Sequence, residues 1–273
     1  MSKFVHLHVH SQYSILDGQA SIQRLVDKAM ADGQPGIAVT DHGDMFGIKE
    51  FYNYVKKQNG KKHDKIKTLK KLSAGLEKLL AEGSDPAARL RLLKEELAAL
   101  EGRKNDSPED AEACAAARAR VEEVESMQKE FGFDPAAAQE KIAGLEAVPD
   151  FKPIIGCEVY VARRGMADRV HGIDNDPYHL VLLCENRKGY ENLCYLVSEA
   201  FIHGFYGKPR IDLQLLQQHH EGLIALSACL AGAIPQYLME EDYDSAKEYA
   251  KKMSGSAGHL FLSYQPSPPS TMR

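Results

Sequence analysis

The sequence predicts an α/β domain in which short strands alternate with helices. Before residue 60 and again from Pro153 onwards, short apolar runs bounded by glycine or turn residues alternate with segments of helical periodicity. This alternation favours parallel strands joined by helical crossovers. Polar side chains that can bind metal ions stand at the ends of several runs, where α/β barrels carry their chemistry.

The N-terminal part, residues 1–59, contains two predicted strand and helix pairs. Phe4 to His10 has the pattern of a strand, and Ser21 is a suitable N-cap for a helix that ends near Gly33. Gly36 to Thr40 is a short apolar strand, and a second helix is expected from Phe46 to Lys57. These four elements form the first part of the predicted domain.

Residues 60–150 are predicted to be a charged helical insertion. Leucines follow a 3-4-3 spacing from Leu69 to Leu79 and again from Leu90 to Leu100, and Ala117, Val121, Val124 and Gln128 repeat it more weakly. Such narrow apolar stripes are typical of coiled coils. Pro86 and Pro108 follow breaks in the pattern and suit the first turns of new helices. We expect an antiparallel coiled-coil arm, and the lysines from Lys56 to Lys71 leave a partner-binding or DNA-binding role open.

The second part of the domain is expected at residues 151–253. Its predicted elements are strands at Ile154 to Ala162, Leu180 to Cys184 and Gly222 to Ala228, and helices at Gly189 to His203 and Asp244 to Met253. Residues 254–273 are rich in Ser, Gly and Pro and are predicted to be a disordered tail.

Composition restricts the class of protein. The net charge of −5, with basic and acidic residues mixed, provides no overall basic surface for nucleic acid, although local arginines and metal ions can hold a phosphate chain. Arg163-Arg164 and Lys208-Pro209-Arg210 are local candidates, and solvated surface charge is the alternative interpretation. Five cysteines without a CxxC pair favour a reducing, cytoplasmic setting. No secretory signal is recognisable, and the longest apolar stretch is too short to span a bilayer, so no membrane association is expected.

Three alternate histidines indicate a metal site near the N-terminus. In an extended strand, His6, His8 and His10 project from the same side. Imidazole is the commonest protein ligand for zinc and related ions, and Asp17 in the following turn can close over the same ion. A strand that merely exposes histidines is the alternative.

Further candidate ligands lie in or beside later strands. Asp41 and His42 follow the second strand, and Glu158 interrupts an apolar run, where a buried carboxylate needs a metal or a charge partner. His179 begins the next strand and Cys229 follows another. Mixed imidazole and carboxylate ligands suit zinc, manganese or iron and the hydrolysis of phosphate esters. Neither a GxxxxGK[ST] phosphate loop nor a GxSxG elbow is present.

The sequence closely resembles the polymerase and histidinol phosphatase (PHP) domain, in the version that opens the alpha subunit of bacterial DNA polymerase III. The resemblance is carried by HLHVHSQYSILDG at 6–18, AVTDHGDMFG at 38–47, PIIGCEVYVA at 153–162, the block 179–212, and GLIALSACLAGAIPQ at 222–236. The block 179–212 favours the polymerase branch over free-standing phosphatases.

This resemblance implies a distorted (β/α)7 barrel that holds up to three divalent metal ions. The residues that match metal ligands are His8, His10, Asp17, His42, Glu158, His179 and Cys229, with Asp41 as a catalytic candidate beside them. His6 stands where relatives outside the polymerases often carry Asp, and it is expected to support the ligands rather than to bind a metal ion itself.

The resemblance also implies 3'–5' exonuclease proofreading within a DNA-directed DNA polymerase, a nucleotidyltransferase. The implied partners are the DNA primer 3' end and other subunits of the DNA polymerase III holoenzyme. A catalytically silent scaffold for replisome subunits is the main alternative, and a small-molecule phosphoesterase is a weaker one.

Two features depart from the family pattern. The insertion is absent from many relatives, and its role is open. The family continues to a final Asp-x-His ligand pair and a polymerase palm, neither of which occurs before Arg273. We therefore expect a fragment with a barrel that is incomplete at its C-terminal end.

Overall fold

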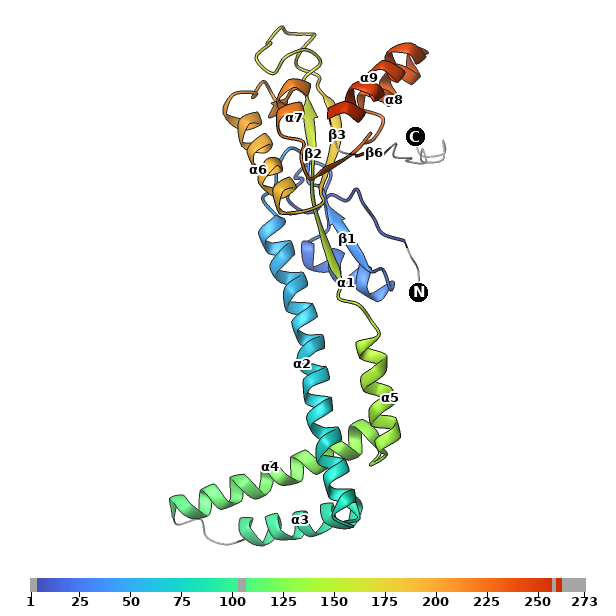
Figure 1. The fold of residues 1–273 in the computed structure, drawn as a ribbon. Coiled ribbons are helices and arrows are strands. Elements are labelled where there is room, and N and C mark those ends of the chain that lie inside the picture. The colour runs from blue at the N-terminus through green and yellow to red at the C-terminus, as the bar shows by residue number, and fades with distance from the viewer. Residues whose placement is uncertain (1–3, 103–106, 257–258, 262–273) are drawn as a thin grey trace, which may run out of the picture. The chain divides into compact units, whose positions relative to one another are not determined.

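The computed structural model describes residues 4–102, 107–256 and 259–261 (Figure 1). The chain divides into two compact units, one formed by residues 1–56 with 151–273 and the other by residues 57–150. Helix α2 (Ile48–Ala81) runs through the boundary that we expected near residue 60. The insertion therefore begins within a helix that the first unit starts, rather than at a loop.

The first helix and the strand after it form as predicted. Helix α1 (Ile22–Ala31) begins after Ser21, whose hydroxyl accepts a hydrogen bond from the Arg24 backbone N–H at 3.4 Å. The apolar face of α1 packs against β1 (Gly36–Val39) and the first turns of α2. The shared core consists of Ile22, Val26, Ala29, Ile37, Val39, Ile48, Phe51 and Val55.

The strand predicted from Phe4 to His10 is wrong, because this segment forms no regular ladder. It still runs beside β1: the Ala38 N–H donates to the His6 carbonyl at 2.8 Å, and the Thr40 N–H donates to the Val9 carbonyl at 2.9 Å. The two donors on β1 are two residues apart, but the two acceptors on the N-terminal segment are three residues apart. The N-terminal segment therefore contains one extra residue at this point, which interrupts a regular strand pairing with β1. The Val9 N–H donates instead to Thr40 Oγ1 at 2.9 Å.

The remaining predicted elements of this unit are present, with additional short ones between them. The structure contains β2 (Lys152–Val161), β3 (Tyr178–Cys184), α6 (Arg187–Ile202), β4 (Arg210–Ile211), α7 (Leu213–Gln218), β5 (Leu223–Leu226), α8 (Ala233–Met239), α9 (Tyr243–Ser256) and β6 (His259–Phe261). The sequence analysis missed β4, α7, α8 and β6, which are too short to show a clear period.

The strands form one mixed sheet in the order β1-β2-β3-β5-β6, with β4 paired to β2. The first half of β2 runs parallel to β1, and its second half runs antiparallel to β3, which is also antiparallel to β5. The prediction of uniformly parallel strands is therefore wrong. Residues 162–177, which connect β2 to β3, contain no crossover helix, and the chain simply reverses. The α/β class is confirmed, whereas the seven-stranded barrel stays a prediction.

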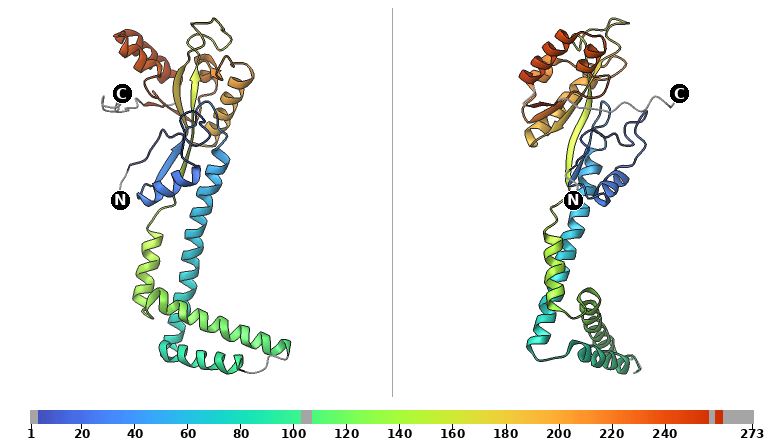
Figure 2. Two further views of the ribbon diagram at one scale, coloured as in Figure 1. Left: turned by 180° about the vertical axis from the view of Figure 1, so that it is seen from behind. Right: turned by 90° about the vertical axis from the view of Figure 1, so that its right-hand side faces the viewer.

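One face of the sheet is covered by helices from the second part of the unit. Leu182 of β3 packs with Leu193 and Leu196 of α6, and Met253 of α9 joins the same core. Helices α8 and α9 are neighbours in both views of Figure 2. Because side chains alternate along a strand, Glu158, Val181 and the other residues between these core positions belong to the opposite face.

The second unit consists of packed helices, as the apolar stripes predicted. Helices α3 (Pro86–Glu101), α4 (Pro108–Phe131) and α5 (Pro135–Glu146) each carry proline in the first turn. Ion pairs of 2.7 Å between Lys94 and Glu125 and of 2.6 Å between Glu101 and Arg118 show that α3 and α4 run in opposite directions. The segment 103–106 between them lies outside the described residues.

Two apolar clusters hold the helices of this unit together. One joins α3 to α4 through Leu90, Leu93, Val121 and Val124, and the other joins α2, α4 and α5 through Leu69, Leu72, Leu76, Met127, Phe131, Ala138 and Ile142. Gln128, which we placed on the apolar stripe, is exposed, and Met127 takes the buried position instead. Residues 57–150 form a compact unit of helices, whereas an insertion into the domain and a coiled-coil supercoil stay predictions.

The prediction of a disordered tail from residue 254 is wrong at its start. Helix α9 continues to Ser256, and β6 pairs in parallel with β5, with His259 opposite Ile224. Pairing with the edge strand β5 satisfies backbone groups of this segment. Residues 257–258 and 262–273 lie outside the described residues. Among the described residues, no helix is long and apolar enough to cross a bilayer.

Candidate metal centre

Six of the seven predicted ligands come together in the first unit, at the end of the sheet where β2 finishes and β3 begins. Three overlapping groups of side chains bring their ligand atoms within 4.8 Å of one another. They are His8 with His10 and Glu158, His10 with Asp17 and His42, and His42 with Glu158 and His179. Glu158 belongs to two of the groups, and because its carboxylate has two acceptor oxygens it can face two ions.

The sheet topology explains how residues so distant in sequence come together. His42 continues the parallel register of β1 along β2 and lies opposite Glu158. His179 starts β3, and the antiparallel pairing places it opposite Tyr160 near the end of β2. Strand β5 runs antiparallel to β3. Cys229, three residues beyond the end of β5, therefore lies at the same end of the sheet as His179. The carboxyl-end rule used in the sequence analysis therefore fails for His179, which lies at the amino end of its strand.

Glu158 is the centre of the cluster and is 1% exposed. Its Oε2 lies 2.7 Å from His10 Nε2, 3.1 Å from His8 Nε2 and 3.2 Å from His42 Nε2. Its Oε1 lies 3.3 Å from His179 Nδ1. Burial would raise the pKa of Glu158, but hydrogen bonds from His10, His179 and His8 outweigh it and hold the pKa well below the usual range. The carboxylate is therefore charged at neutral pH.

Asp17 supplies a second carboxylate on the solvent side of the cluster, where its side chain is 42% exposed. Its Oδ2 lies 2.9 Å from His42 Nδ1 and 3.1 Å from His10 Nδ1. The imidazoles of His10 and His42 thus each face Glu158 with Nε2 and Asp17 with Nδ1. Hydrogen bonding at one ring nitrogen fixes the orientation of the other, which is how carboxylates commonly support metal-binding histidines.

The histidines differ in their affinity for protons. Burial lowers the pKa of His179, but hydrogen bonds with Cys229 and Glu158 outweigh it and raise the pKa to about 9. The pKa of His10 is also raised, since Glu158 and Asp17 overcome the opposing effect of burial. The pKa of His42 is lowered by burial and by the neighbouring His179 and His10, despite the attraction of Glu158.

The spacing of the donor atoms fits metal coordination. For metal–nitrogen bonds of 2.0–2.1 Å, tetrahedral ligand atoms lie roughly 3.3 Å apart. The ring nitrogens of His8 and His10 are 3.2 Å apart, and those of His42 and His179 are 3.3 Å apart. In addition, His8 Nδ1 is buried without a hydrogen-bond partner among the described residues, which leaves a ring nitrogen unsatisfied beside the candidate ligands. The donor set therefore fits divalent ions.

Cys229 borders the same cluster. Its Sγ lies 3.6 Å from His179 Nδ1 and 3.8 Å from Glu158 Oε1. For a tetrahedral ion with a metal–sulfur bond near 2.3 Å, the distance between sulfur and nitrogen ligands is roughly 3.6 Å. Cys229 therefore lies at ligand spacing from His179 and borders Glu158, although it is not a member of the three groups.

Asp41, our catalytic candidate, belongs to none of the three groups and bonds instead to the loop that follows His10. It is 1% exposed, and its carboxylate accepts hydrogen bonds from the Ser11 N–H at 2.6 Å, the Ser11 hydroxyl at 2.8 Å and the Ser14 hydroxyl at 2.8 Å. Ser14 Oγ in turn accepts from the His42 N–H at 3.0 Å. These contacts do not support a catalytic role, and they indicate that Asp41 positions the loop between His10 and Asp17.

His6, which we expected to support the ligands, lies outside the three groups of candidate ligands. It is exposed, and its ring contacts Phe4 edge-on with a centroid distance of 4.7 Å. The irregular pairing of the N-terminal segment breaks the alternation that would have placed it beside His8.

The sequence analysis missed Tyr160. Its ring stacks on His42 with a centroid distance of 5.1 Å and planes 7° apart, and it meets His179 edge-on at 5.2 Å. The signal was present, since Tyr160 follows Glu158 by two residues and so projects from the same face of β2. Gly43 allows the close approach, because a Cβ there would lie 2.8 Å from the Tyr160 ring.

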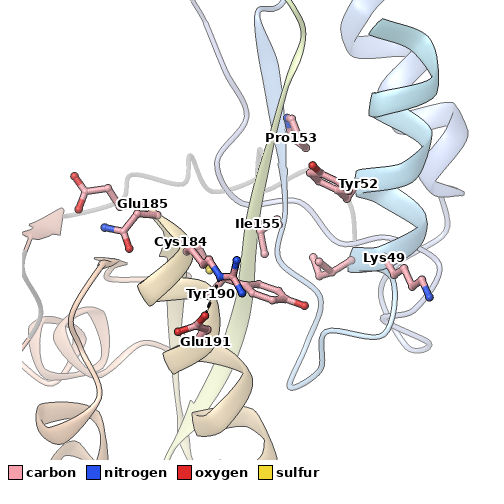
Figure 3. Close-up of a pocket in the computed structure, with 11 residues that line it drawn as sticks. Lys49, Tyr52, Pro153, Ile155, Cys184, Glu185, Tyr190 and Glu191 are labelled. Carbon is pink, nitrogen blue, oxygen red and sulfur yellow. Dashed lines mark hydrogen bonds and ion pairs between the residues drawn. The ribbon is translucent and has the colours of Figure 1, made fainter. Parts of the chain in front are cut away.

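A cavity of about 640 Å³ lies at the other end of β2 and is separate from the candidate ligands. Its lining comes from the first turns of α2, the start of β2 and the β3–α6 connection (Figure 3). Tyr52 and Tyr190 contribute aromatic surface to it, and Arg187 is held at its rim by a 3.0 Å hydrogen bond to Glu191.

Comparison with known proteins decides the family. The model of the PHP domain matches residues 6–105 and 110–265, which is most of the chain. The chain belongs to the PHP domain family. The matched region contains every candidate ligand, and the resemblance inferred from the sequence is confirmed. The match to residue 265 also includes the strand β6, which follows the expected end of the domain.

Similar curated proteins are alpha subunits of DNA polymerase III. The PHP chain is 34% identical to that of Treponema pallidum over 250 residues, 91% of this chain and 14% of the relative. It is 30% identical to that of Thermus aquaticus over 90% of this chain and 13% of the relative, and 32% identical to that of Chlamydia trachomatis over 90% and 12%. The chain thus corresponds to about an eighth of the length of these relatives.

Proposed function

We propose that this PHP domain is a metal-dependent phosphodiesterase that removes nucleotides from the 3' end of DNA. The overlapping groups around Glu158 and Asp17 carry the proposal, because they offer imidazole and carboxylate donors at coordination spacing. The similarity to DNA polymerase III alpha subunits supports a DNA substrate and a role in proofreading during replication.

Two or three divalent ions held by His8, His10, Asp17, His42, Glu158, His179 and Cys229 would supply Lewis-acid activation of the phosphodiester and of an attacking water. Zinc, manganese and iron all match this donor set. Glu158 would remain charged and shared between two groups, and the low pKa of His42 would keep its imidazole neutral and available as a ligand. Asp41 would hold the loop that carries Asp17 toward the histidines.

The test is metal analysis combined with a nuclease assay on the purified chain. After reconstitution with zinc, manganese or iron, we expect stoichiometric metal and stepwise shortening of an oligonucleotide labelled at its 5' end. An oligonucleotide with a blocked 3' terminus should resist digestion, which distinguishes an exonuclease from an endonuclease. A chain that binds metal stoichiometrically but shortens neither DNA nor RNA would contradict the proposal.

A scaffold for other replication subunits is the second candidate function. It is favoured by the cavity beside Tyr52 and Tyr190, which is separate from the cluster and of a size that accepts anchoring side chains. A pull-down with purified DNA polymerase III subunits, comparing the wild type with Tyr190→Ala, would test it. Loss of a specific partner in the variant would support the scaffold, and unchanged binding would exclude this surface.

A further inference from the structure

Lys208 lies beside the candidate metal centre and is the one described lysine with a cation–π contact. Its ammonium is positioned over the ring of Tyr160, with the nitrogen 4.6 Å from the ring centroid. The same ring stacks on the His42 imidazole at 5.1 Å. No carboxylate of the described residues lies within ion-pair distance of Lys208, whereas lysines such as Lys62, Lys70 and Lys141 are paired.

The loop around Lys208 is held firmly in place. The Tyr206 N–H donates to the Lys208 carbonyl at 3.0 Å, and Gly207 between them has φ of +69°, a conformation that favours glycine. Pro209 follows and packs near Gly43, since a Cβ at Gly43 would lie 3.2 Å from its ring. These contacts fix the backbone at the point from which the lysine side chain departs.

Arg210 anchors this loop from inside the protein. It is fully buried, and its guanidinium donates to the carbonyls of Gly204 at 3.1 Å, Asp174 at 2.7 Å, and Met166 and Asp168 at 3.0 Å each. Arg163 and Arg164 are also occupied, the first by Asp176 at 2.9 Å and the second by Asp174. Of the four basic residues in Arg163-Arg164 and Lys208-Pro209-Arg210, Lys208 is therefore the one available to a ligand.

We infer that Lys208 binds a backbone phosphate of the nucleic-acid substrate, next to the phosphate that is cleaved. One aromatic ring separates the ammonium from a candidate metal ligand, with centroid distances of 4.6 and 5.1 Å. Successive phosphates on one strand of B-form DNA rise by roughly 3.4 Å along the axis and lie further apart than that, so this separation spans at most about three nucleotides. The cation–π contact with the Tyr160 ring holds the Lys208 ammonium in place without neutralising its charge.

This role rests on the proposed phosphodiesterase function and specifies its substrate class. A phosphate outside the reacting bond exists in a polynucleotide but not in a simple phosphodiester. Lys208 should therefore strengthen the binding of polynucleotide substrates, and it should contribute nothing to the hydrolysis of a small diester. As a positioning residue, it should affect KM more than kcat.

The test compares Lys208→Ala with Lys208→Arg and with Lys188→Ala, a matched control because Lys188 is exposed on α6 and distant from the cluster in sequence and sheet position. Circular dichroism first verifies that each variant folds. For a single-stranded oligonucleotide we expect Lys208→Ala to raise KM roughly five- to tenfold with little change in kcat, since one phosphate contact is lost. Lys208→Arg should restore most of the affinity, and Lys188→Ala should match the wild type.

Two further measurements separate this inference from the proposed function. Hydrolysis of bis(p-nitrophenyl) phosphate should be unchanged in Lys208→Ala. The salt dependence of single-stranded DNA binding, measured by fluorescence anisotropy without hydrolysis, should decrease in slope by about 0.7. Equal DNA affinity and salt slope in the wild type and Lys208→Ala would overturn the inference, as would an equal loss on both substrates. Lys208-dependent DNA binding by a chain that hydrolyses neither substrate would support the inference and contradict the phosphodiesterase.

Discussion

Glu158 Oε2 lies 2.7 Å from His10 Nε2, although the two residues are 148 positions apart and the helical insertion separates them in the sequence. This contact joins the N-terminal segment to the centre of the sheet. The N-terminal segment has no regular strand pairing of its own, so the contact contributes to its position as well as to the candidate metal site. Several properties of the protein follow from it.

Replacing Glu158 with Gln should remove the charge that two candidate metal groups share. We expect the variant to lose at least one equivalent of bound metal. Any hydrolytic activity should fall roughly a hundredfold or more, because removing a metal ligand lowers activity further than removing a residue that only supports a ligand. Metal content after gel filtration and the rate of oligonucleotide digestion measure the two effects. Glu185→Gln is the control, since Glu185 is exposed at the cavity near the other end of β2. Wild-type metal content in Glu158→Gln would contradict the assignment.

Two substitutions of Asp41 distinguish a role in positioning the loop from a role in catalysis. Asp41→Ala removes the acceptor of three buried hydrogen bonds from Ser11 and Ser14, which should destabilise the fold by about 2–4 kcal/mol. Asp41→Asn retains an acceptor for the Ser11 N–H, and the serine hydroxyls can rotate to accept from the amide. If Asp41 positions the loop, Asn should preserve most activity and stability.

Thermal denaturation and single-turnover hydrolysis distinguish the two roles of Asp41. A variant Asp41→Asn that melts like the wild type but loses its activity would restore the catalytic interpretation that the sequence suggested. Ser14→Ala, which removes one of the three bonds, should be milder than Asp41→Ala in both assays.

The sequence was sufficient to predict the α/β class, the helices of residues 60–150 and most of the side chains that gather around Glu158, because these depend on local patterns. The buried carboxylate of Glu158 within an apolar strand is such a pattern, as is the spacing of His8 and His10. The reversal between β2 and β3 was not predictable in this way, since residues 162–177 contain no helix and their course depends on anchors such as Arg210. The role of Asp41 was also not predictable, because it depends on which neighbour the carboxylate faces.

His179 should make the stability of the metal-free protein depend on pH. Its pKa is raised from 6.5 to about 9 in the fold, so its protonated form stabilises the fold fully below about pH 6.5. This contribution, on the order of 2–3 kcal/mol, should be lost as the pH rises through about 9. Melting in the presence of a chelator from pH 6 to 10 should show the decline in the wild type, and His179→Gln should lack it.

Bound metal should reverse this trend, because coordination requires the deprotonated imidazole. The stabilisation that added zinc confers should therefore increase with pH over the same interval. His171→Gln, which replaces an exposed histidine of the β2–β3 connection, is the control and should follow the wild type. A decline of equal size in His179→Gln would assign the pH dependence to another group.

The helical insertion has its own core, which can be weakened separately. Leu76 is fully buried in the cluster that joins α2, α4 and α5, and Leu76→Ala should cost about 2–5 kcal/mol through the cavity that it leaves. Leu80 lies one turn further along α2 and is 40% exposed, so Leu80→Ala should change stability by well under 1 kcal/mol. Chemical denaturation with hydrogen exchange would locate the loss in residues 57–150. Because the candidate ligands all belong to the other unit, metal content should be unchanged, and a parallel loss of metal in Leu76→Ala alone would show that the two units fold as one.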